Sequence, residues 1–318
     1  MSRVHASIDI GTHTARLLIA QKCGIPGHLI TPLARKRAYI RLAEGLSRSE
    51  NKDIPSVAID RTLNVLKNFS GYLKRFRVHS VNAVATGVIR EAPNRDQFLG
   101  RIYEETGIRV RAITGVEEAY LTAKGALQAL NIHTDPFVVF DLGGGSTEFL
   151  IGSEGTRVAR SVPLGAMILT KRYLGSDPPG KAEVEALSRH VDQCLFDADL
   201  NVPGARDFSL LVGTGGTVAT LAAMLHGIPL GDIAADRING LLLKRRKIEA
   251  LFSEIRTLSL DARLKLPGLD KGRADVILAG CLTITRILYF FKSLQLRVSL
   301  SDLLEGILVE KLEGEGND

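Results

Sequence analysis

The sequence has no tryptophan, and aromatic residues make up only 5% of its 318 residues. Proteins that bind single-stranded nucleic acids stack the bases on aromatic side chains, so this composition argues against a nucleic acid polymer as a partner. The three cysteines, Cys23, Cys194 and Cys281, are widely spaced and do not form a zinc-binding or redox pattern. We therefore expect reduced cysteines in a cytoplasmic protein.

The sequence also offers no convincing membrane segment. Residues 208–231 carry no acidic or strongly basic side chain, but glycines, Pro229 and several threonines interrupt the stretch, unlike a spanning helix. The N-terminal residues lack the apolar core of a secretory signal. These features predict no contact with a membrane, and they indicate that residues 208–231 form a buried strand, a glycine turn and a buried helix.

The positive charge is concentrated in the first third of the chain. Residues 1–110 contain 18 Lys and Arg against 9 Asp and Glu, a net charge of +9, whereas the whole chain carries +6. Such asymmetry favours a polyanionic partner, with a merely solvated basic surface as the alternative. The run Lys244–Lys247 is interpreted as the basic start of a helix, and contact with a polyanion is the alternative there.

Predicted strands and helices alternate along the whole chain, which indicates the α/β class. At this length two domains are expected. Apolar spacings of three and four residues predict helices, and alternation predicts strands. The predicted helices are 59–76, 95–106, 117–130, 181–195, 247–258, 274–291 and 302–312, and the predicted strands include 7–11, 16–20, 79–86, 110–113, 138–142, 149–152, 210–212 and 296–300.

An internal repeat organises the chain. Residues 9–20 align without a gap on residues 141–152, with Asp, Gly, Leu and Ile at matching positions and Thr14 on Ser146. The two copies lie 132 residues apart, which is about one domain length. A duplicated domain explains this better than two unrelated strand–turn–strand segments.

Three glycine-containing turns each follow a predicted buried strand: residues 11–14, 143–147 and 213–217. Glycine lets the backbone approach a ligand closely, and consecutive free amides form nests that bind phosphate. None of the three turns matches the phosphate loop of P-loop NTPases or the dinucleotide-binding fingerprint, so those two classes are disfavoured.

Carboxylates flank or neighbour these turns. Asp141 and Glu148 could hold a divalent cation against a bound phosphate, because Mg²⁺ takes one or two carboxylates plus phosphate oxygens. Glu118 could act as a base toward water, although for a glutamate at a helix start, taken alone, stabilisation of the helix dipole is the commoner explanation. Arg16 and Arg90 are candidate phosphate ligands, with surface ion pairs as the alternative.

The order of these motifs resembles that of the exopolyphosphatase/guanosine pentaphosphate phosphohydrolase (Ppx/GppA) family, in its short two-domain form. The resemblance covers nearly the whole chain. It rests on DIGTHTAR at 9–16, VATGVIREA at 84–92, GVEEA at 115–119, DLGGGSTE at 141–148, GTGGT at 213–217, RADVILAG at 273–280, and VSLSD at 298–302 followed by Glu305 and Gly306.

This resemblance implies two ribonuclease-H-like domains of the actin-like ATPase superfamily with a cleft between them. We place these domains at 1–124 and 125–300, with the helix at 301–318 packing back on the first. It also implies a homodimer and hydrolysis of terminal phosphoanhydrides that depends on Mg²⁺ or Mn²⁺. The implied catalytic residues are Glu118, Asp141 and Glu148, the implied metal ligands are Asp141, Glu148 and Asp9, and the implied substrate-binding residues are Thr12, His13, Thr14, Arg16, Arg90, Gly143, Gly144, Gly145, Ser146, Thr147, Gly213, Gly215, Gly216 and Thr217.

The first turn departs from the family pattern, which usually has Ser and Asn where this chain has Thr12 and His13. At these two positions the resemblance does not predict how the first turn contacts phosphate or how that contact depends on pH. The leading hypothesis is an exopolyphosphatase that acts on inorganic polyphosphate. A pppGpp 5′-phosphatase, with (p)ppGpp as the ligand, would use the same catalytic groups. A third hypothesis is a non-catalytic sensor of polyphosphate or nucleotides. The presence of Glu118, Asp141 and Glu148 argues against it.

Overall fold

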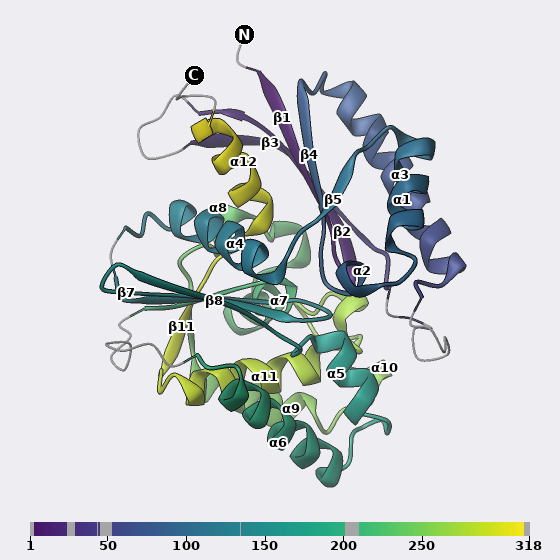
Figure 1. Cartoon of the computed structure of the whole chain (residues 1–318). Coiled ribbons are helices and arrows are strands. Elements are labelled where there is room, and N and C mark those ends of the chain that lie inside the picture. The colour runs from purple at the N-terminus through teal and green to yellow at the C-terminus, as the bar shows by residue number, and fades with distance from the viewer. Residues whose placement is uncertain are drawn as a thin grey trace. The chain divides into compact units, whose positions relative to one another are not determined.

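The computed structural model describes residues 3–23, 29–42, 44, 53–133, 135–200 and 210–314 (Figure 1). The chain divides into two compact units: unit 1 is Met1–Asn131 with Asp302–Asp318, and unit 2 is Ile132–Ser301. The division predicted after residue 124 falls inside a helix of unit 1. Within the described ranges, no helix combines the length and the apolar character needed to cross a membrane.

Unit 1 contains a five-stranded sheet in the order β3-β2-β1-β4-β5. β1 pairs with β2 in antiparallel and with β4 in parallel orientation, and β5 is parallel to β4. Its elements are β1 Val4–Ile10, β2 Thr14–Lys22, β3 Ile30–Tyr39, α1 Ser56–Arg75, β4 Ser80–Ala85, α2 Val88–Glu91, α3 Arg95–Thr106, β5 Val110–Ala112, α4 Gly115–Ala129 and α12 Leu303–Gly314.

Helices cover both faces of this sheet. Alternate residues of a strand point to opposite faces, and in β2 Leu17 and Ile19 belong to the core cluster that includes residues of α1 and α3. Leu18 and Ala20 instead pack against Leu304 and Leu308 of α12. Figure 1 shows α4 and α12 side by side, and they pack on each other. The last helix is therefore an integral layer of unit 1.

Unit 2 contains a six-stranded sheet in the order β10-β11-β9-β6-β7-β8. Its elements are β6 Phe137–Leu142, β7 Thr147–Ser153, β8 Thr156–Val162, α5 Ala166–Tyr173, α6 Lys181–Asp197, β9 Leu211–Thr214, α7 Gly216–His226, α8 Ala235–Ile238, β10 Leu242–Lys244, α9 Arg245–Ile255, α10 Leu260–Arg263, α11 Ile277–Phe290 and β11 Gln295–Val298, with short 3₁₀ turns η3 Leu230–Asp232 and η4 Lys271–Arg273.

The two sheets repeat one topology. In each unit a meander of three antiparallel strands continues into parallel strands: β3-β2-β1 then β4-β5 in unit 1, and β8-β7-β6 then β9-β11 in unit 2. The hairpins match in register, because Asp9 lies opposite Arg16 as Asp141 lies opposite Glu148. The structure thus confirms the duplication inferred from the sequence repeat.

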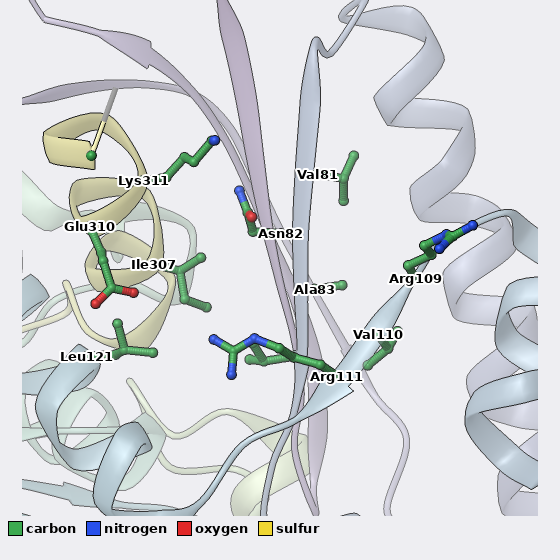
Figure 2. A pocket seen from close by; sticks show the side chains of 12 residues that line it. Val81, Asn82, Ala83, Arg109, Val110, Arg111, Leu121, Ile307, Glu310 and Lys311 are labelled. Atoms are coloured by element: carbon green, nitrogen blue, oxygen red, sulfur yellow. The ribbon is translucent and has the colours of Figure 1, made fainter. Parts of the chain in front are cut away.

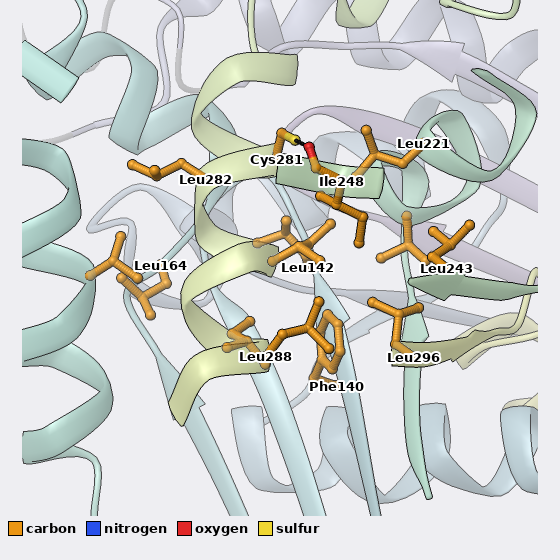
Figure 3. Close-up of a cluster of buried hydrophobic side chains, with 14 of the residues drawn as sticks. Phe140, Leu142, Leu164, Leu221, Leu243, Ile248, Cys281, Leu282, Leu288 and Leu296 are labelled. Carbon is orange, nitrogen blue, oxygen red and sulfur yellow. Dashed lines mark hydrogen bonds between the residues drawn. The ribbon is translucent and has the colours of Figure 1, made fainter. Parts of the chain in front are cut away.

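One apolar cluster joins the sheet of unit 2 to α5, α6, α7, α9 and α11 (Figure 3). Phe140 and Leu142 of β6 contribute to it from the strand that leads into the glycine-rich turn. Leu243 and Ile248 anchor β10 and α9 in the same cluster. Because protein interiors are densely packed, this core fixes the ends of β6 and β9, where the predicted site residues begin.

The predicted helices and strands are confirmed, with shifts of a few residues at their ends. The part of the 208–231 prediction that falls before residue 210 lies outside the described residues. The apolar patterns of the sequence did not predict β3, β8, β10, helix α5 or the short helices α2, α8 and α10. In β3, ITPLARKRAY, a proline and three successive basic residues hide the strand pattern, since this edge strand is only partly buried.

Candidate active site

In unit 1 the predicted residues follow the carboxyl ends of three neighbouring strands. Ile10 at the end of β1 pairs with Ala85 at the end of β4, and the Ile113 amide after β5 donates to the Ala85 carbonyl at 3.1 Å. In α/β sheets, ligands bind at this edge. The first turn, the loop into α2 and the start of α4 are therefore gathered at one edge of one sheet.

Asp9 and the partly buried Arg16 form an ion pair across the first hairpin. Arg16 donates to one oxygen of Asp9 from Nε at 2.9 Å and from Nη2 at 2.7 Å, and Thr86 donates to the other at 3.2 Å. Burial raises the pKa of Asp9, and the Arg16 guanidinium opposes that rise. Nη1 of Arg16 also contacts the carboxylate of Asp302 at the start of α12. Arg16 is thus held by two carboxylates, one of them 286 residues away in sequence.

The first turn is closed by a hydrogen bond from the Gly11 amide to the Thr14 carbonyl at 3.0 Å. The Thr12 hydroxyl accepts from the amide of Val88 at 3.1 Å. This contact needs glycine at position 87, where φ is +59° and a Cβ would lie 2.2 Å from the Thr12 hydroxyl oxygen. The loop that leads to α2 is therefore fitted to the first turn.

His13 is buried, and its ring meets the ring of Tyr39 edge-on at a centroid distance of 5.1 Å. Its carbonyl accepts hydrogen bonds from the amides of Ile40 and Arg41, both at 3.0 Å. The histidine that departs from the family pattern is thus packed into the end of β3. Thr14 is the first residue of β2.

Glu118 lies in the first turn of α4. Thr114 caps this helix, because its side chain accepts from the Glu117 amide at 3.1 Å. The Glu118 side chain is buried and accepts from Nη1 of Arg90 at 3.0 Å. Arg90 also donates to the Ile113 carbonyl at 3.3 Å. The predicted base and one predicted phosphate ligand are therefore an ion pair at the carboxyl edge of this sheet.

Unit 2 carries the second hairpin, and its carboxylates are paired differently. Asp141 and Glu148 are both buried and lie directly opposite each other on β6 and β7. Residues opposite each other on antiparallel strands project from the same face of the sheet. Glu148 accepts a hydrogen bond from the Ser161 hydroxyl at 2.7 Å. Where unit 1 places an arginine across from its aspartate, unit 2 places a second acid.

The glycine-rich turn between these strands is tied to α5. The Gly143 amide donates to the Ser146 carbonyl at 3.0 Å, as in the first hairpin, and the carbonyls of Gly143 and Gly144 accept from the first amides of α5. Among the described residues, the amides of Gly144, Gly145 and Ser146 have no backbone acceptor. Three successive amides are thus available to an anion, as in the nests that bind phosphate.

The remaining turn residues are structural neighbours of the same strands. Thr147 begins β7, and its hydroxyl donates to the Leu164 carbonyl at 2.8 Å. Gly213 lies in β9 opposite Phe140, and a Cβ there would approach the Phe140 ring to 2.8 Å. These two positions support the turns through packing.

The third glycine turn brings the start of α7 next to Asp141. Gly215 has φ +94°, and a Cβ there would lie 2.6 Å from Oδ1 of Asp141. A Cβ on Gly216 would lie 1.7 Å from Nη2 of Arg273, so this guanidinium packs on the first residue of α7. Thr217 follows, with its side chain against Gly280 of α11. A carboxylate, an arginine and a helix N-terminus, which favours anions, thus meet here.

Two residues that contact the predicted site residues were not predicted from the sequence to belong to the site. Arg273 and Asp302 were noted only within family-like segments, and each acts through a contact that is distant in sequence. The available signal was a charged residue next to an apolar helix, Arg273 before α11 and Asp302 before α12. That signal does not distinguish such residues from ordinary surface charges.

The carboxylates of Asp141 and Glu148 fit the binding of a divalent cation. Across the described ranges, no group of three or more His, Cys, Asp or Glu residues could enclose a metal. Mg²⁺, however, commonly uses one or two carboxylates and takes its other ligands from water and phosphate. The Asp141–Glu148 pair meets this need, and Ser161 orients one of the two carboxylates. Asp9 differs, because Arg16 already occupies one of its oxygens.

A cavity of about 540 Å³ in unit 1 lies between β4, β5 and α12 and contains none of the predicted residues (Figure 2). Arg111 lines it, but its Nη1 lies 2.5 Å from the carboxylate of Glu117. Glu310 adds a negative charge to the wall. Arg109 and Lys311 also line the cavity, which is thus separate from the predicted phosphate ligands of unit 1.

The sequence and the fold of this chain are similar to those of known phosphatases. Residues 19–315 match the Ppx/GppA phosphatase family. Exopolyphosphatase 2 of Mycobacterium tuberculosis (strain ATCC 25618 / H37Rv) is 33% identical over 314 residues, which cover 95% of this chain and 96% of that protein. Two solved structures are also similar: the Ppx/GppA family member of Aquifex aeolicus (30% identity, TM-score 0.81, 99% of each chain) and an exopolyphosphatase from Cytophaga hutchinsonii (28%, TM-score 0.87, 98% of each).

The solved relatives have the actin-like ATPase fold, which confirms the fold class expected from the sequence. The family match and the 33% identity cover nearly the whole chain. The duplicated hairpins and their glycine turns lie within the matched region or directly before it. On this evidence, the chain belongs to the Ppx/GppA phosphatase family.

Proposed function

We propose that the protein is an exopolyphosphatase, a hydrolase that releases terminal orthophosphate from inorganic polyphosphate. The observation that carries the proposal is the pair of buried carboxylates, Asp141 and Glu148, beside a turn whose amides are available to a phosphate. Relatives of similar length are named exopolyphosphatases, which supports the choice of substrate.

In the proposed reaction, Glu118 accepts a proton from the attacking water. Arg90 holds the Glu118 carboxylate through the 3.0 Å contact and restricts its orientation. The water oxygen forms a bond to the terminal phosphorus, and the bond from that phosphorus to the bridging oxygen breaks. The products are orthophosphate and a chain that is shorter by one phosphate. Positioning and charge stabilisation are the main contributions of a protein to such a reaction.

The phosphate groups are proposed to bind at the turns. In unit 2 the amides of Gly144 to Ser146 and the start of α7 with Arg273 would receive phosphate oxygens. In unit 1 the proposed contacts are residues 12–14, Arg16 and Arg90. A divalent cation held by Asp141 and Glu148 would neutralise charge on the phosphate oxygens.

The test uses Glu118→Gln with Glu117→Gln as its matched control. Glu117 sits in the same turn of α4 but pairs with Arg111. We expect Glu118→Gln to lower the kcat for phosphate release roughly 10²- to 10⁴-fold without weakening polyphosphate binding, while Glu117→Gln stays near wild type. Near-normal turnover by Glu118→Gln would remove Glu118 from the mechanism.

The substrate itself needs a separate measurement, because the family also includes guanosine pentaphosphate phosphohydrolases. Phosphate release should be compared between polyphosphates of several lengths and pppGpp. A higher kcat/KM for polyphosphate supports the proposal. A higher value for pppGpp would assign the same site to the alternative function, and no release from either substrate would refute both.

Three finer proposals accompany this function. Family members generally depend on a divalent metal. We propose Mg²⁺ for this protein, with Mn²⁺ as the alternative. Measuring the activity after chelation and re-addition of each metal distinguishes the two. We propose a homodimer, which light scattering coupled to size-exclusion chromatography tests. We propose a cytoplasmic location, which fractionation of the source cells tests.

A further inference from the structure

A groove of about 510 Å³ in unit 2 lies where the end of α7, the edge strand β10 and helix α9 meet. Its volume is within the range of small-molecule sites. None of the residues assigned to the reaction lines it. The groove is lined by Met224, Leu225, His226, Leu242, Leu243, Lys244, Arg246, Lys247, Ala250, Leu251 and Glu254.

The groove combines an apolar floor with a basic rim. Leu243 is buried at its base, and Leu225 and Leu251 are partly buried against the same core. Lys244, Arg246 and Lys247 are exposed along the rim, against a single carboxylate, that of Glu254. These three cations are therefore available to a multiply charged anion.

The fourth basic residue of the run, Arg245, has protein partners of its own and does not face the groove. The Arg245 guanidinium lies over the Tyr289 ring at 4.2 Å and donates to the Ser293 carbonyl at 3.3 Å, so it does not line the groove. The first turn of α9 contains no acidic residue. Cations at a helix N-terminus are unfavourable toward the helix dipole, so a bound anion would relieve this repulsion.

The groove is separate from the proposed active site. Helix α7 begins at Gly216, beside Asp141 and Arg273, and its last residues, Met224 to His226, line the groove. Eleven residues of helix span about 16 Å. A ligand in the groove would therefore contact the opposite end of the helix whose first turn belongs to the phosphate site.

We propose that this groove binds a chain of linked phosphate groups, which inorganic polyphosphate or a nucleoside polyphosphate can present. The phosphates contact Lys244, Arg246 and Lys247. The two sources differ at the floor: a nucleobase covers the exposed parts of Leu225 and Leu251, whereas inorganic polyphosphate does not contact these side chains. The proposal goes beyond the proposed function, because it concerns a second site and requires no hydrolysis there.

Hydrogen exchange on the full chain, with divalent metals chelated to stop turnover, tests the proposal locally. Long-chain polyphosphate, ATP and orthophosphate are added at equal phosphate concentration. We expect polyphosphate or ATP to protect amides of residues 242–251, while orthophosphate does not. The ligand that protects at the lower concentration identifies the source. Absence of protection with all three would overturn the proposal.

The decisive variant replaces Lys244, Arg246 and Lys247 with alanine. A matched control removes three exposed cations of the same unit, Lys181, Arg189 and Lys265. Loss of one charged contact is worth a roughly tenfold change in affinity, so the groove variant should need at least tenfold more ligand for the same protection, and the control should not. Equal behaviour of the two triple variants would refute a specific site.

The same proteins separate this proposal from the proposed function. Phosphate release from the shortest polyphosphates, measured with metal present, reports the active site and should be unchanged in the groove variant. If wild type releases no phosphate but residues 242–251 are protected, the proposed function fails and the groove site stands. If phosphate is released without such protection, the groove site fails and the function stands.

Discussion

Replacing Gly306 with alanine should destabilise unit 1 and displace α4, the helix that carries the proposed base Glu118. A Cβ at Gly306 would lie 1.8 Å from the carbonyl oxygen of Leu121 on α4. Gly125, one turn further along α4, is as close to α12, since its Cβ would lie 2.1 Å from the Asp302 carbonyl oxygen. The two backbones are thus in direct contact, and no rotamer change can make room for a methyl group.

The size of the effect follows from this geometry. Cβ contacts below 3.0 Å are essentially never observed, so α4 and α12 must separate by about 1.2 Å at this point. Overpacking of this kind costs about 3 kcal/mol. The better helix propensity of alanine returns about 1 kcal/mol, which leaves a net loss of about 2 kcal/mol. Because Glu118 lies on α4 three residues before Leu121, kcat should fall as well.

Urea denaturation measures the free energy of unfolding, and hydrogen exchange of α4 and α12 amides assigns the loss to unit 1. Gly100→Ala is the matched control, since Gly100 lies in α3 and a Cβ there meets nothing within 4 Å. That control should stabilise unit 1 by about 0.5–1 kcal/mol. If Gly306→Ala is as stable as Gly100→Ala, the contact between the two backbones is not as close as inferred.

Three further predictions concern single side chains. Ser161→Ala should raise the metal concentration for half-maximal activity about tenfold, because Glu148 loses the hydroxyl that orients it; an unchanged titration would argue against Glu148 as a ligand. Burial raises the pKa of Asp9, and the negative charge of Asp302 adds to that rise, so Asp302→Asn should lower this pKa in a ¹³C carboxyl titration. A serine hydroxyl and backbone amides of the loop before α6 lower the pKa of Glu183 from 4.5 to about 2. The contribution of Glu183 to stability is therefore present above pH 4.5 and is lost as the pH falls toward 2. In Glu183→Gln the melting temperature should change less with pH between 4.5 and 2, and a pH profile like that of wild type would contradict this.

The repeat made the fold predictable from the sequence. A glycine turn between two apolar segments defines a hairpin, and an aligned second copy defines a duplicated unit. The facing positions of Asp141 and Glu148 then follow from the hairpin, because a turn of fixed length sets the strand register. The strands that escaped prediction lie at sheet edges, where little burial is required and the apolar pattern is weak. The helices that escaped prediction, including α5, span eight residues or fewer, too few for a clear helical period.

The site was predicted as a set of residues, but their partners were not. Arg16 had been interpreted as a phosphate ligand, yet in the structure its guanidinium contacts both Asp9 and Asp302. No local pattern links residue 16 to residue 302, since that contact depends on how α12 packs on β1 and β2. Arg273 was missed for the same reason, because its place over Gly216 is set by the path of the chain into α11. The roles of these residues remain predictions.

The position of α12 in unit 1 has a consequence for biosynthesis. Unit 2 is one continuous segment, residues 132–301, whereas unit 1 needs residues from both ends of the sequence. A chain that is made from its N-terminus can therefore complete unit 2 first, while the face of β1 and β2 that receives Leu304 and Leu308 waits uncovered. During that interval Arg16 lacks Asp302 and Arg35 lacks Glu305. Helix α12, which is synthesised after the whole of unit 2, completes a sheet whose strands were synthesised before unit 2.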